Sequence, residues 1–454
     1  MSALWEAADL RAATGGVMAG EFAANGVAID SRALAPGDLF IALRAARDGH
    51  DFVTAALRQG ATGAMVDHRP ADLPRDAPLL LVQDTLAGLT ALGAYGRARA
   101  TGQVFAITGS VGKTTTKEML RAILATQTTV HAAEASHNNQ WGVPLTLARL
   151  PPDAGAAVVE IGMNHAGEIL PLARLARPHA AIITAIAPAH IGNLGSLEAI
   201  AREKASLLAG VIAGGVAVLP AESEFLPLLR AAAAGLRVIT FGEPGAARLI
   251  AFAGDAAGST VRADIGGREF TFRLGLAGRP MALNALAALA AAAALGFDPE
   301  IGAAALADFR GLAGRGARRP IRLPKGGTAT LIDESYNASP AAMRAALAVL
   351  ALQKGRRVAV LGDMLELGAA GAAEHAALAA AAASSADLVF ACGPLMRQLF
   401  AAIPAAQQGA YAPDAASLAP LLEASLDAGD VVLVKGSLGS RMRVIIARLE
   451  GEQR

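Results

Sequence analysis

The chain has 454 residues, a formal net charge of +1 and a single cysteine, Cys392. This length suits two to four domains, the balanced charge gives a nucleic-acid partner no support, and one cysteine excludes an internal disulfide framework. Residues 1–6 lack the basic and apolar segments of a leader, and no apolar run reaches the roughly 20 residues of a membrane span. We therefore expect a cytoplasmic protein with no membrane insertion.

The first region, residues 1–100, is built from short strands and turns. Strands are predicted at Val27–Ile29 and Leu39–Leu43, with Pro36-Gly37-Asp38 as the turn before the second, and a helix at Val53–Arg58. This pattern indicates a small α/β unit at the start of the chain.

The middle region, residues 101–313, alternates apolar strands with helices, which is the pattern of a parallel sheet covered by helices. Helices are expected from Lys113, over Leu197–Leu208 and over Leu283–Leu295. The predicted strands are Val104–Ile107, Ala156–Ile161, Ala180–Ile186 and Val216–Leu219.

A glycine-containing loop joins the first of these strands to the helix that follows. The loop runs Thr108-Gly109-Ser110-Val111-Gly112-Lys113-Thr114-Thr115-Thr116. Its glycines let backbone N–H groups approach phosphate oxygens beside the positive end of a helix dipole. Lys113 is placed to reach the β- and γ-phosphates, and the Thr114 hydroxyl to hold Mg²⁺. The position that usually holds the first glycine is Thr108, so the loop belongs to a narrower T-G-x-x-G-K-T class. A strand–helix turn with a solvated lysine is the alternative.

Further polar residues follow the next strands of the same sheet. Glu160 stands near the end of its strand, where an ionised carboxylate is costly unless it is paired or bound to a metal ion. A Mg²⁺ ion shared by Thr114 and Glu160 satisfies both groups, and a salt-bridged structural glutamate is the alternative. His190 is a candidate ligand or a hydrogen-bonded loop residue. Lys204 lies beside Glu203 in a predicted helix, and its spacing alone indicates a solvated surface lysine.

The stretch Ser136–Pro144 gathers polar donors ahead of a turn. Asn138 and Asn139 suit phosphate or amide recognition, and an ordinary capped loop explains them equally well.

The last region, residues 314–454, is a second series of alternating strands and helices, and the glycines and arginines at 311–320 favour a hinge before it. Asp333 ends the first strand, ahead of Asn337 and of Pro340, which is suited to open a helix. An acid at a strand end is able to hydrogen-bond a ribose, and Asp363 and Lys435 occupy similar positions. The predicted strands are Thr328–Asp333, Arg357–Leu361, Leu388–Ala391 and Val431–Val434.

Taken together, these segments resemble the Mur ligase family of peptidoglycan synthesis over nearly the whole chain. The loop at 108–116 is similar to the family's own phosphate loop, and the other motifs stand in the family's order. The segments that carry the resemblance are Asp30–Arg32, Pro36–Phe40, Asp48–Phe52, Glu160–Ile169, Ile332–Pro340, Leu361–Gly368 and Val434–Ser437 with Arg441-Met442.

The resemblance implies a three-domain α/β fold. It implies a UDP-sugar-peptide-binding domain over 1–100, a central P-loop parallel-sheet ATPase domain over 101–313, and a Rossmann-like C-terminal ligase domain over 314–454. The implied activity is that of a monomeric, ATP-dependent ligase that joins D-alanyl-D-alanine to UDP-N-acetylmuramoyl-tripeptide through an acyl phosphate. The residues expected in substrate binding are Ser31, Arg32, Asn138, Asn139 and Asn337.

The resemblance also assigns roles at the site, with Lys113, His190 and Lys204 as the expected catalytic residues. Thr114 and Glu160 are expected to hold one Mg²⁺ and His190 a second. Lys204, fourteen positions after His190, resembles the family lysine that CO₂ converts to a carbamate, which replaces the surface interpretation and supplies a further magnesium ligand. ATP is expected to contact the loop residues Thr108, Gly109, Ser110, Val111, Gly112, Lys113, Thr114 and Thr115, as well as Asn284, Arg315 and Asp333.

Three positions depart from the family pattern. Ala135-Ser136 stands where Gly-Asn is usual, Met281 where a histidine is common, and Glu334 where a second aspartate is usual. The first and third changes conserve the chemistry, whereas the second affects contacts near Asn284.

Two other classes of function remain as alternatives. Folate polyglutamate synthesis uses a related loop and an acyl phosphate, but the segment Asp30–Phe52 argues against it. A nucleotide-dependent switch predicts slow ATP hydrolysis without an acid or an amine, and it leaves the motifs of the last region unexplained.

Overall fold

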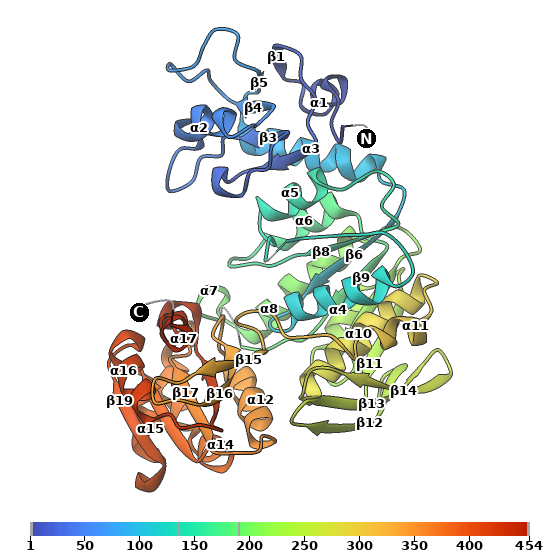
Figure 1. Ribbon diagram of the computed structural model, residues 1–454. Coiled ribbons are helices and arrows are strands. Elements are labelled where there is room, and N and C mark those ends of the chain that lie inside the picture. Colours follow the sequence, from blue (N-terminus) through green and yellow to red (C-terminus); the bar gives the residue numbers. More distant parts are fainter. Residues whose placement is uncertain (1–2, 135, 189–190, 452–454) are drawn as a thin grey trace.

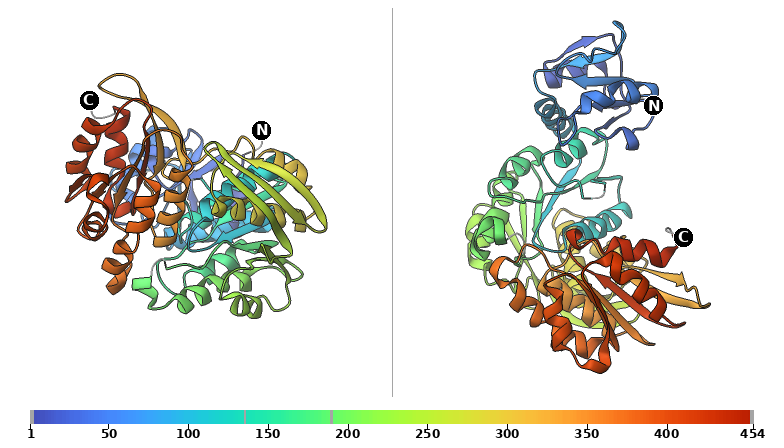
Figure 2. Two further views of the ribbon diagram at one scale, coloured as in Figure 1. Left: turned by 90° about the horizontal axis from the view of Figure 1, so that it is seen from below. Right: turned by 90° about the vertical axis from the view of Figure 1, so that its left-hand side faces the viewer.

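The computed structural model describes residues 3–134, 136–188 and 191–451, the side chain of Ile191 excepted. Three β-sheets follow one another along the chain, each with its own helices, and they divide the molecule into three domains (Figure 1). The N-terminal domain lies at one end, and the C-terminal domain lies beside the middle domain at the other (Figures 1 and 2). This is the three-domain α/β fold that the sequence predicts.

The N-terminal domain consists of short elements. They are α1 Ala7–Thr14, β1 Val17–Ala19, β2 Gly26–Ala28, η1 Ser31–Ala33, β3 Asp38–Ile41, η2 Gly49–Phe52, α2 Val53–Arg58, β4 Gly63–Val66, β5 Leu79–Leu81 and α3 Thr85–Arg99, where η denotes a 3₁₀ helix. The strands form one sheet in the order β1-β5-β4-β3-β2, parallel except for β1. The carboxyl ends of β2, β3 and β4 therefore lie at one edge of this sheet.

The middle domain is the largest of the three. Its elements are β6 Gln103–Thr108, α4 Lys113–Ala125, β7 Val130–Ala132, α5 Gly142–Ala148, β8 Ala156–Glu160, α6 Ile169–Ala176, β9 Ala180–Ile183, α7 Ile191–Leu194, α8 Leu197–Ala205, η3 Ser206–Gly210, β10 Val216–Pro220, α9 Leu226–Ala232, β11 Arg237–Gly242, β12 Ala247–Asp255, β13 Gly258–Ile265, β14 Arg268–Leu274, α10 Arg279–Ala294 and α11 Pro299–Ala304. They include every strand and helix predicted for this region. The sheet order is β14-β13-β12-β11-β10-β9-β6-β8-β7.

The parallel sheet expected for the middle region is present, and an antiparallel part extends it at one end. Strands β12, β13 and β14 pair antiparallel and extend the sheet beyond β11. Buried and solvent-facing residues alternate along β13, as expected for antiparallel strands with one covered face. The seven strands from β7 to β12 are parallel, and β6, which leads to the phosphate loop, lies between β8 and β9.

The strands at the centre of the middle sheet are buried on both faces. Phe105 and Ile107 of β6 pack with α4 and α10, whereas Val104 and Ala106 pack on the opposite face with α5, α6, α8 and α9. The apolar face of α4 predicted from Met119, Leu120, Ile123 and Leu124 is fully buried. Burying each such large side chain contributes about 1.5–3 kcal/mol. This packing fixes the position of β6, and with it the loop that follows.

The N-terminal domain shares a core with the middle domain. Helix α3 crosses α5 so closely that a Cβ atom at Gly96 would lie 2.3 Å from the Leu147 carbonyl oxygen. The Trp5 indole donates to the Ala148 carbonyl at 2.8 Å, and Arg149 Nε donates to the Val27 carbonyl at 2.6 Å. The two domains are therefore joined by close helix packing and by hydrogen bonds to backbone carbonyls.

The C-terminal domain has a six-stranded sheet. Its elements are β15 Ala317–Arg322, β16 Thr328–Glu334, α12 Pro340–Ala351, β17 Arg357–Gly362, η4 Gly368–Ala370, α13 Gly371–Ala376, α14 Ala379–Ser385, β18 Leu388–Cys392, α15 Met396–Ala402, η5 Ala405–Gln407, β19 Gln408–Ala412, α16 Ala415–Ser425, β20 Val431–Lys435, η6 Leu438–Ser440 and α17 Arg443–Glu450. The strand order is β15-β16-β20-β17-β18-β19, with only β15 antiparallel to its neighbour.

The hinge predicted over 311–320 is shorter than expected. Residues 317–322 form β15, which pairs with β16 from Ala317 opposite Asp333 to Arg322 opposite Thr328. Pro320 is accommodated because β15 is an edge strand, where the missing N–H leaves no ladder bond unmade. The linker is therefore confined to residues before Ala317. No helix among the described ranges combines the length and apolar character needed to span a membrane.

Candidate active site

The phosphate loop links β6 to α4 as predicted. Gly109 and Gly112 have φ angles of +153° and +86°, which side chains rarely allow. A Cβ atom at Gly109 would lie 1.9 Å from Thr184 Oγ1, and one at Gly112 would lie 2.7 Å from Asn284 Oδ1. Both glycines are therefore required by backbone conformation and by the closeness of neighbouring side chains.

Two contacts that the sequence did not indicate shape this loop. Thr184 follows β9, and its hydroxyl donates to the Val111 carbonyl at 2.5 Å. Ser110 Oγ donates to the Ala187 carbonyl at 2.9 Å and accepts from the Ala187 N–H at 3.0 Å. The role of Thr184 could have been suspected from the sequence, because it is a polar residue at the end of a strand predicted to lie in the same sheet as β6. These bonds hold the loop against the segment after β9.

Lys113 is the first residue of α4, and its side chain folds back over the phosphate loop. Its Nζ donates to the Gly109 carbonyl at 2.8 Å. Burial lowers the pKa of Lys113; the charge of Glu160 opposes this effect, and the charge of Arg315 adds to it. Lys113, Glu160 and Arg315 thus interact electrostatically although they come from α4, β8 and the interdomain linker, respectively. A triphosphate placed on the loop would supply the negative charge that Lys113 and Arg315 lack.

Glu160 ends β8 and is fully buried. Its Oε1 accepts a hydrogen bond from Asn138 Nδ2 at 2.8 Å, and no described group lies within hydrogen-bond distance of its Oε2. The structural salt bridge considered for Glu160 is therefore absent among the described residues. Thr114 is also buried, with its hydroxyl 3.5 Å from Ser136 Oγ. An orphaned carboxylate oxygen and a hydroxyl are hard oxygen donors, and they fit Mg²⁺.

Lys204 on α8 is 1% exposed, so the surface interpretation of this residue is wrong. Burial and the nearby charge of Lys113 lower the pKa of Lys204 well below its ordinary value, and Glu203 opposes them only in part. In the described parts of the chain, no hydrogen-bond acceptor contacts its amine. An ammonium group is not a metal ligand, so Lys204 fits a magnesium site only in a chemically modified form.

A cavity of about 200 Å³ extends from the phosphate loop to the C-terminal domain. Its walls are mainly apolar, with Met281 and Val349 on opposite domains, and the amide of Asn284 and the guanidinium of Arg315 supply polar groups. Arg315 donates to Ser136 Oγ at 3.2 Å, and its guanidinium lies 3.9 Å from the centre of the Tyr336 ring. An apolar slot next to a phosphate loop suits the planar base of a nucleotide.

Several predicted site residues have structural partners. Asp333 accepts hydrogen bonds from the Gly314 N–H at 2.9 Å and from the Ser335 hydroxyl at 2.6 Å, and both of its oxygens are engaged. Asn139 caps α5 by accepting from the Gly142 N–H at 3.0 Å. Asn337 is exposed and accepts from the Ala338 N–H at 2.8 Å. Their roles in ATP or substrate binding stay predictions.

Ser31 and Arg32 lie in the N-terminal domain, after β2, and the Arg32 side chain is exposed and paired with Asp30. At the same edge of that sheet, His50 Nδ1 donates to Asp48 Oδ1 at 2.6 Å while its Nε2 accepts from the Asp67 N–H, and its ring stacks on the ring of His68 at 4.2 Å. This edge is where open parallel sheets bind ligands. The remaining predicted ligand, His190, lies outside the described residues.

The phosphate loop, the orphaned acid and the apolar slot together define an enzyme that binds a nucleoside triphosphate with a divalent metal ion. The sequence matches two protein-family descriptions, "Mur ligase middle domain" over residues 107–292 and "Mur ligase, glutamate ligase domain" over 319–438. The chain is 35% identical over 439 residues to UDP-N-acetylmuramoyl-tripeptide–D-alanyl-D-alanine ligase of Escherichia coli (strain K12), covering 94% of each chain.

Comparison with solved structures gives the same family. A crystal structure of MurF from Acinetobacter baumannii superposes with a TM-score of 0.86 at 32% identity, over 98% of this chain and 99% of that one. A MurF ligase from Thermotoga maritima in complex with ADP gives a TM-score of 0.78 at 26% identity, over 94% of this chain and 97% of that one. The chain belongs to the Mur ligase family of ATP-dependent ligases.

Proposed function

We propose that this protein joins D-alanyl-D-alanine to UDP-N-acetylmuramoyl-tripeptide at the expense of ATP, in the synthesis of a peptidoglycan precursor. The observation that carries the proposal is the buried, half-satisfied Glu160 beside the phosphate loop, in a chain that is similar over 94% of its length to an enzyme named for this reaction. We propose that the reaction takes place in the cytoplasm and that the enzyme acts as a monomer.

The proposed reaction has two steps. The terminal carboxylate of the tripeptide attacks the γ-phosphorus of ATP in line, which forms an acyl phosphate and releases ADP. The amine of D-alanyl-D-alanine then attacks the acyl carbon, and inorganic phosphate leaves. The protein supplies no nucleophile, so its contribution is to position the reactants and to neutralise charge.

The described residues support specific roles in these steps. Lys113 at the start of α4 offsets the charge of the transferred phosphoryl group, and Asn284 beside Gly112 contacts the base in the apolar slot. Arg315 reaches from the linker to Ser136, which holds the C-terminal domain against the middle domain during the reaction. Closure of the domains around the reactants would limit hydrolysis of the acyl phosphate by water.

The residues present fit a magnesium ion at Thr114 and Glu160, where the ion, when bound, would neutralise charge on the triphosphate and the attacking carboxylate. We propose that His190 and a carbamate on Lys204 provide ligands for a second ion. A buried amine without an acceptor favours this modification, because reaction with CO₂ replaces an uncompensated ammonium by an anion beside Lys113.

We propose the domain limits 1–100, 101–313 and 314–454, with the UDP-sugar portion bound by the N-terminal domain. Ser31 and Arg32 at the carboxyl edge of its sheet support that placement, with Asn138 continuing the path into the middle domain. The terminal carboxylate would then reach the phosphate loop, and D-alanyl-D-alanine would approach from the C-terminal domain.

The test measures phosphate release from ATP with UDP-N-acetylmuramoyl-tripeptide and D-alanyl-D-alanine, each omitted in turn, and weighs the product by mass spectrometry. Release that needs both substrates, together with a UDP-linked pentapeptide, supports the proposal. Release stimulated by folates would favour the folate ligase alternative, and slow release indifferent to both substrates would favour a nucleotide-dependent switch. Either of the last two results would overturn the proposed function.

A further inference from the structure

The loop between β7 and α5 is held from three sides. Lys117 on α4 donates to the Ala133 carbonyl, and Arg149 on α5 pairs with Glu134 at 2.8 Å. Ser136 accepts from Arg315, which comes from the linker to the C-terminal domain. The loop therefore receives a contact from the nucleotide-binding helix, from the helix that packs on the N-terminal domain, and from the linker.

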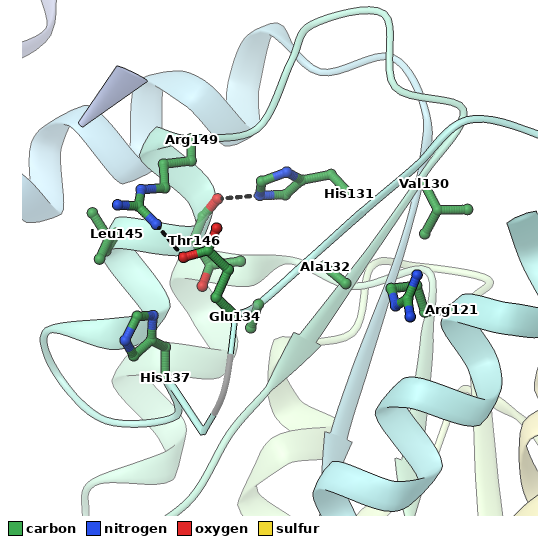
Figure 3. Close-up of a pocket in the computed structure, with 10 residues that line it drawn as sticks. Arg121, Val130, His131, Ala132, Glu134, His137, Leu145, Thr146 and Arg149 are labelled. Atoms are coloured by element: carbon green, nitrogen blue, oxygen red, sulfur yellow. Dashed lines mark hydrogen bonds and ion pairs between the residues drawn. The ribbon is translucent and has the colours of Figure 1, made fainter. Parts of the chain in front are cut away.

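Figure 3 shows the outer side of this loop. Glu134 on the loop meets Arg149 across a hollow of about 240 Å³ that is also lined by β7 and by Arg121 of α4. His131 of β7 donates from its Nε2 to the Thr146 carbonyl of α5 at 2.8 Å. On its inner side the loop faces Glu160 and the phosphate loop. Any displacement of the loop would therefore alter the reaction centre directly.

Lys117 is the most deeply buried of these contacts. It is fully buried, one helical turn beyond Lys113, and its ammonium lies 2.9 Å from a carboxylate oxygen of Glu118. Burial alone would raise the pKa of Glu118, but hydrogen bonds from Lys117 and Arg121 hold it below its ordinary value. A buried ion pair is weak evidence for stability, because dehydrating two charges offsets most of their attraction. Its presence here calls for a reason other than stability.

The contacts of the loop give that reason. The Ala133 N–H donates to the Val158 carbonyl of β8 at 3.2 Å, so Ala133 is the last residue tied to the sheet before the loop begins. Five residues later, the backbone carbonyl of Asn138 accepts from the Gly162 N–H at 2.8 Å, and the side-chain amide of Asn138 donates to Glu160. The bond from Lys117 fixes where the chain leaves the sheet, and hence where Asn138 meets Glu160.

We propose that Lys117 is a positioning residue for the phosphoryl-transfer step. It ties the loop that carries Ser136 and Asn138 to α4, the helix that carries Lys113 and Thr114. The proposed substrate-binding residues of the loop therefore keep a fixed position relative to the nucleotide-binding residues of the helix. The proposal rests on the proposed function for the identity of the reaction. Its structural content is the bond between the Lys117 ammonium and the Ala133 carbonyl.

The first test compares Lys117→Met, which keeps the aliphatic stem but removes the donor, with Lys117→Gln, which keeps a shorter neutral donor. Arg121→Met is the matched control, because Arg121 lies on the same helix and pairs with the same Glu118 but is half exposed. We expect kcat to fall by about 10- to 100-fold in Lys117→Met, less in Lys117→Gln, and less than about twofold in the control. The affinity for ADP should change by less than about threefold in all three variants.

Two further measurements separate positioning from a general loss of folding. Amide hydrogen exchange at residues 136–141 should accelerate in Lys117→Met and not in Arg121→Met. In an Asn138→Ala background, Lys117→Met should lower kcat by less than about threefold more, because both changes act through the same contact with Glu160. An unchanged kcat in a folded Lys117→Met protein, unchanged loop exchange, or additive losses would each overturn the proposal. If the unmodified chain shows no release dependent on both substrates, the proposed function fails, while the exchange measurement still tests the loop.

Discussion

The middle and C-terminal domains both bury ionisable residues, but the two domains satisfy the hydrogen bonds of these residues differently. In the middle domain, Glu160 at the end of β8 has one orphaned oxygen, and Lys204 on helix α8 has no hydrogen-bond acceptor among the described groups. In the C-terminal domain, Asp363 accepts from the Met396 and Leu395 N–H groups at 2.7 and 3.3 Å, and Lys435 contacts Glu334 and the Asn337 carbonyl. Unsatisfied buried groups are costly, so we interpret the unsatisfied groups of the middle domain as places for ligands and the satisfied groups of the C-terminal domain as parts of the fold.

The largest effect should come from Glu160→Gln. The amide keeps the size of the side chain and an oxygen for Asn138 but removes the negative charge, so kcat/KM should fall by about 100- to 1,000-fold. Unfolding temperature without nucleotide should not fall, because the change removes an incompletely satisfied buried carboxylate. Phosphate release and thermal unfolding, measured on the same sample, check the predicted loss of activity and the predicted retention of stability. A large loss of stability would mean that Glu160 belongs to the fold.

Lys204→Ala should lower activity by at least about 100-fold, since it removes the proposed anionic ligand. Short carboxylic acids such as acetate or propionate should restore part of the activity, because they place a carboxylate in the space left by the side chain. Lys113→Ala serves as the control, and the same acids should leave it inactive. Full activity of Lys204→Ala without any added acid would contradict the carbamate.

Asn284→Ala should produce a smaller change. Asn284 is buried beside Gly112, and no described group hydrogen-bonds its amide, so it fits the pattern of the middle domain. Its loss should raise KM for ATP by about tenfold, which corresponds to one hydrogen bond of about 1.4 kcal/mol. The kcat should change little. Steady-state kinetics at varied ATP check this, and a change in kcat alone would place Asn284 outside the base-binding slot.

Asp363→Asn should have the smallest effect on catalysis and a clear effect on the fold. The amide presents N–H groups where Asp363 accepts from two backbone N–H groups, so the free energy of unfolding should fall by about 1–3 kcal/mol. Activity of the folded protein should remain within about threefold of normal. Denaturant unfolding and kinetics at low temperature make the measurement, and a stable but inactive variant would break the comparison between the two domains.

The sequence was sufficient for features that depend on local pattern. The phosphate loop, the buried face of α4 and the position of Glu160 at a strand end all follow from residue order and hydrophobic spacing. The alternation of strands and helices in the middle and last regions predicted their α/β sheets, and the family resemblance supplied the three-domain arrangement.

Features that depend on tertiary contacts were not available from local pattern. Spacing suggested a surface position for Lys204, and only the packing of α8 against the middle sheet shows that it is buried. The strand β15 contains Arg318, Arg319 and Pro320, a composition typical of a linker, and it becomes a strand because β16 offers an open edge. The contact of Lys117 could not be predicted from residue types, because Lys117 donates to the backbone carbonyl of Ala133 and any residue at that position has such a carbonyl.

The most direct test of the account labels the terminal carboxylate of UDP-N-acetylmuramoyl-tripeptide with oxygen-18 and follows the label during turnover with ATP and D-alanyl-D-alanine. If the carboxylate attacks the γ-phosphorus, each released phosphate carries one oxygen from the carboxylate, and the account predicts labelled phosphate in proportion to the pentapeptide formed. Unlabelled phosphate would mean that water attacks ATP directly. That result would contradict both the acyl phosphate and the interpretation of this site as a ligase centre.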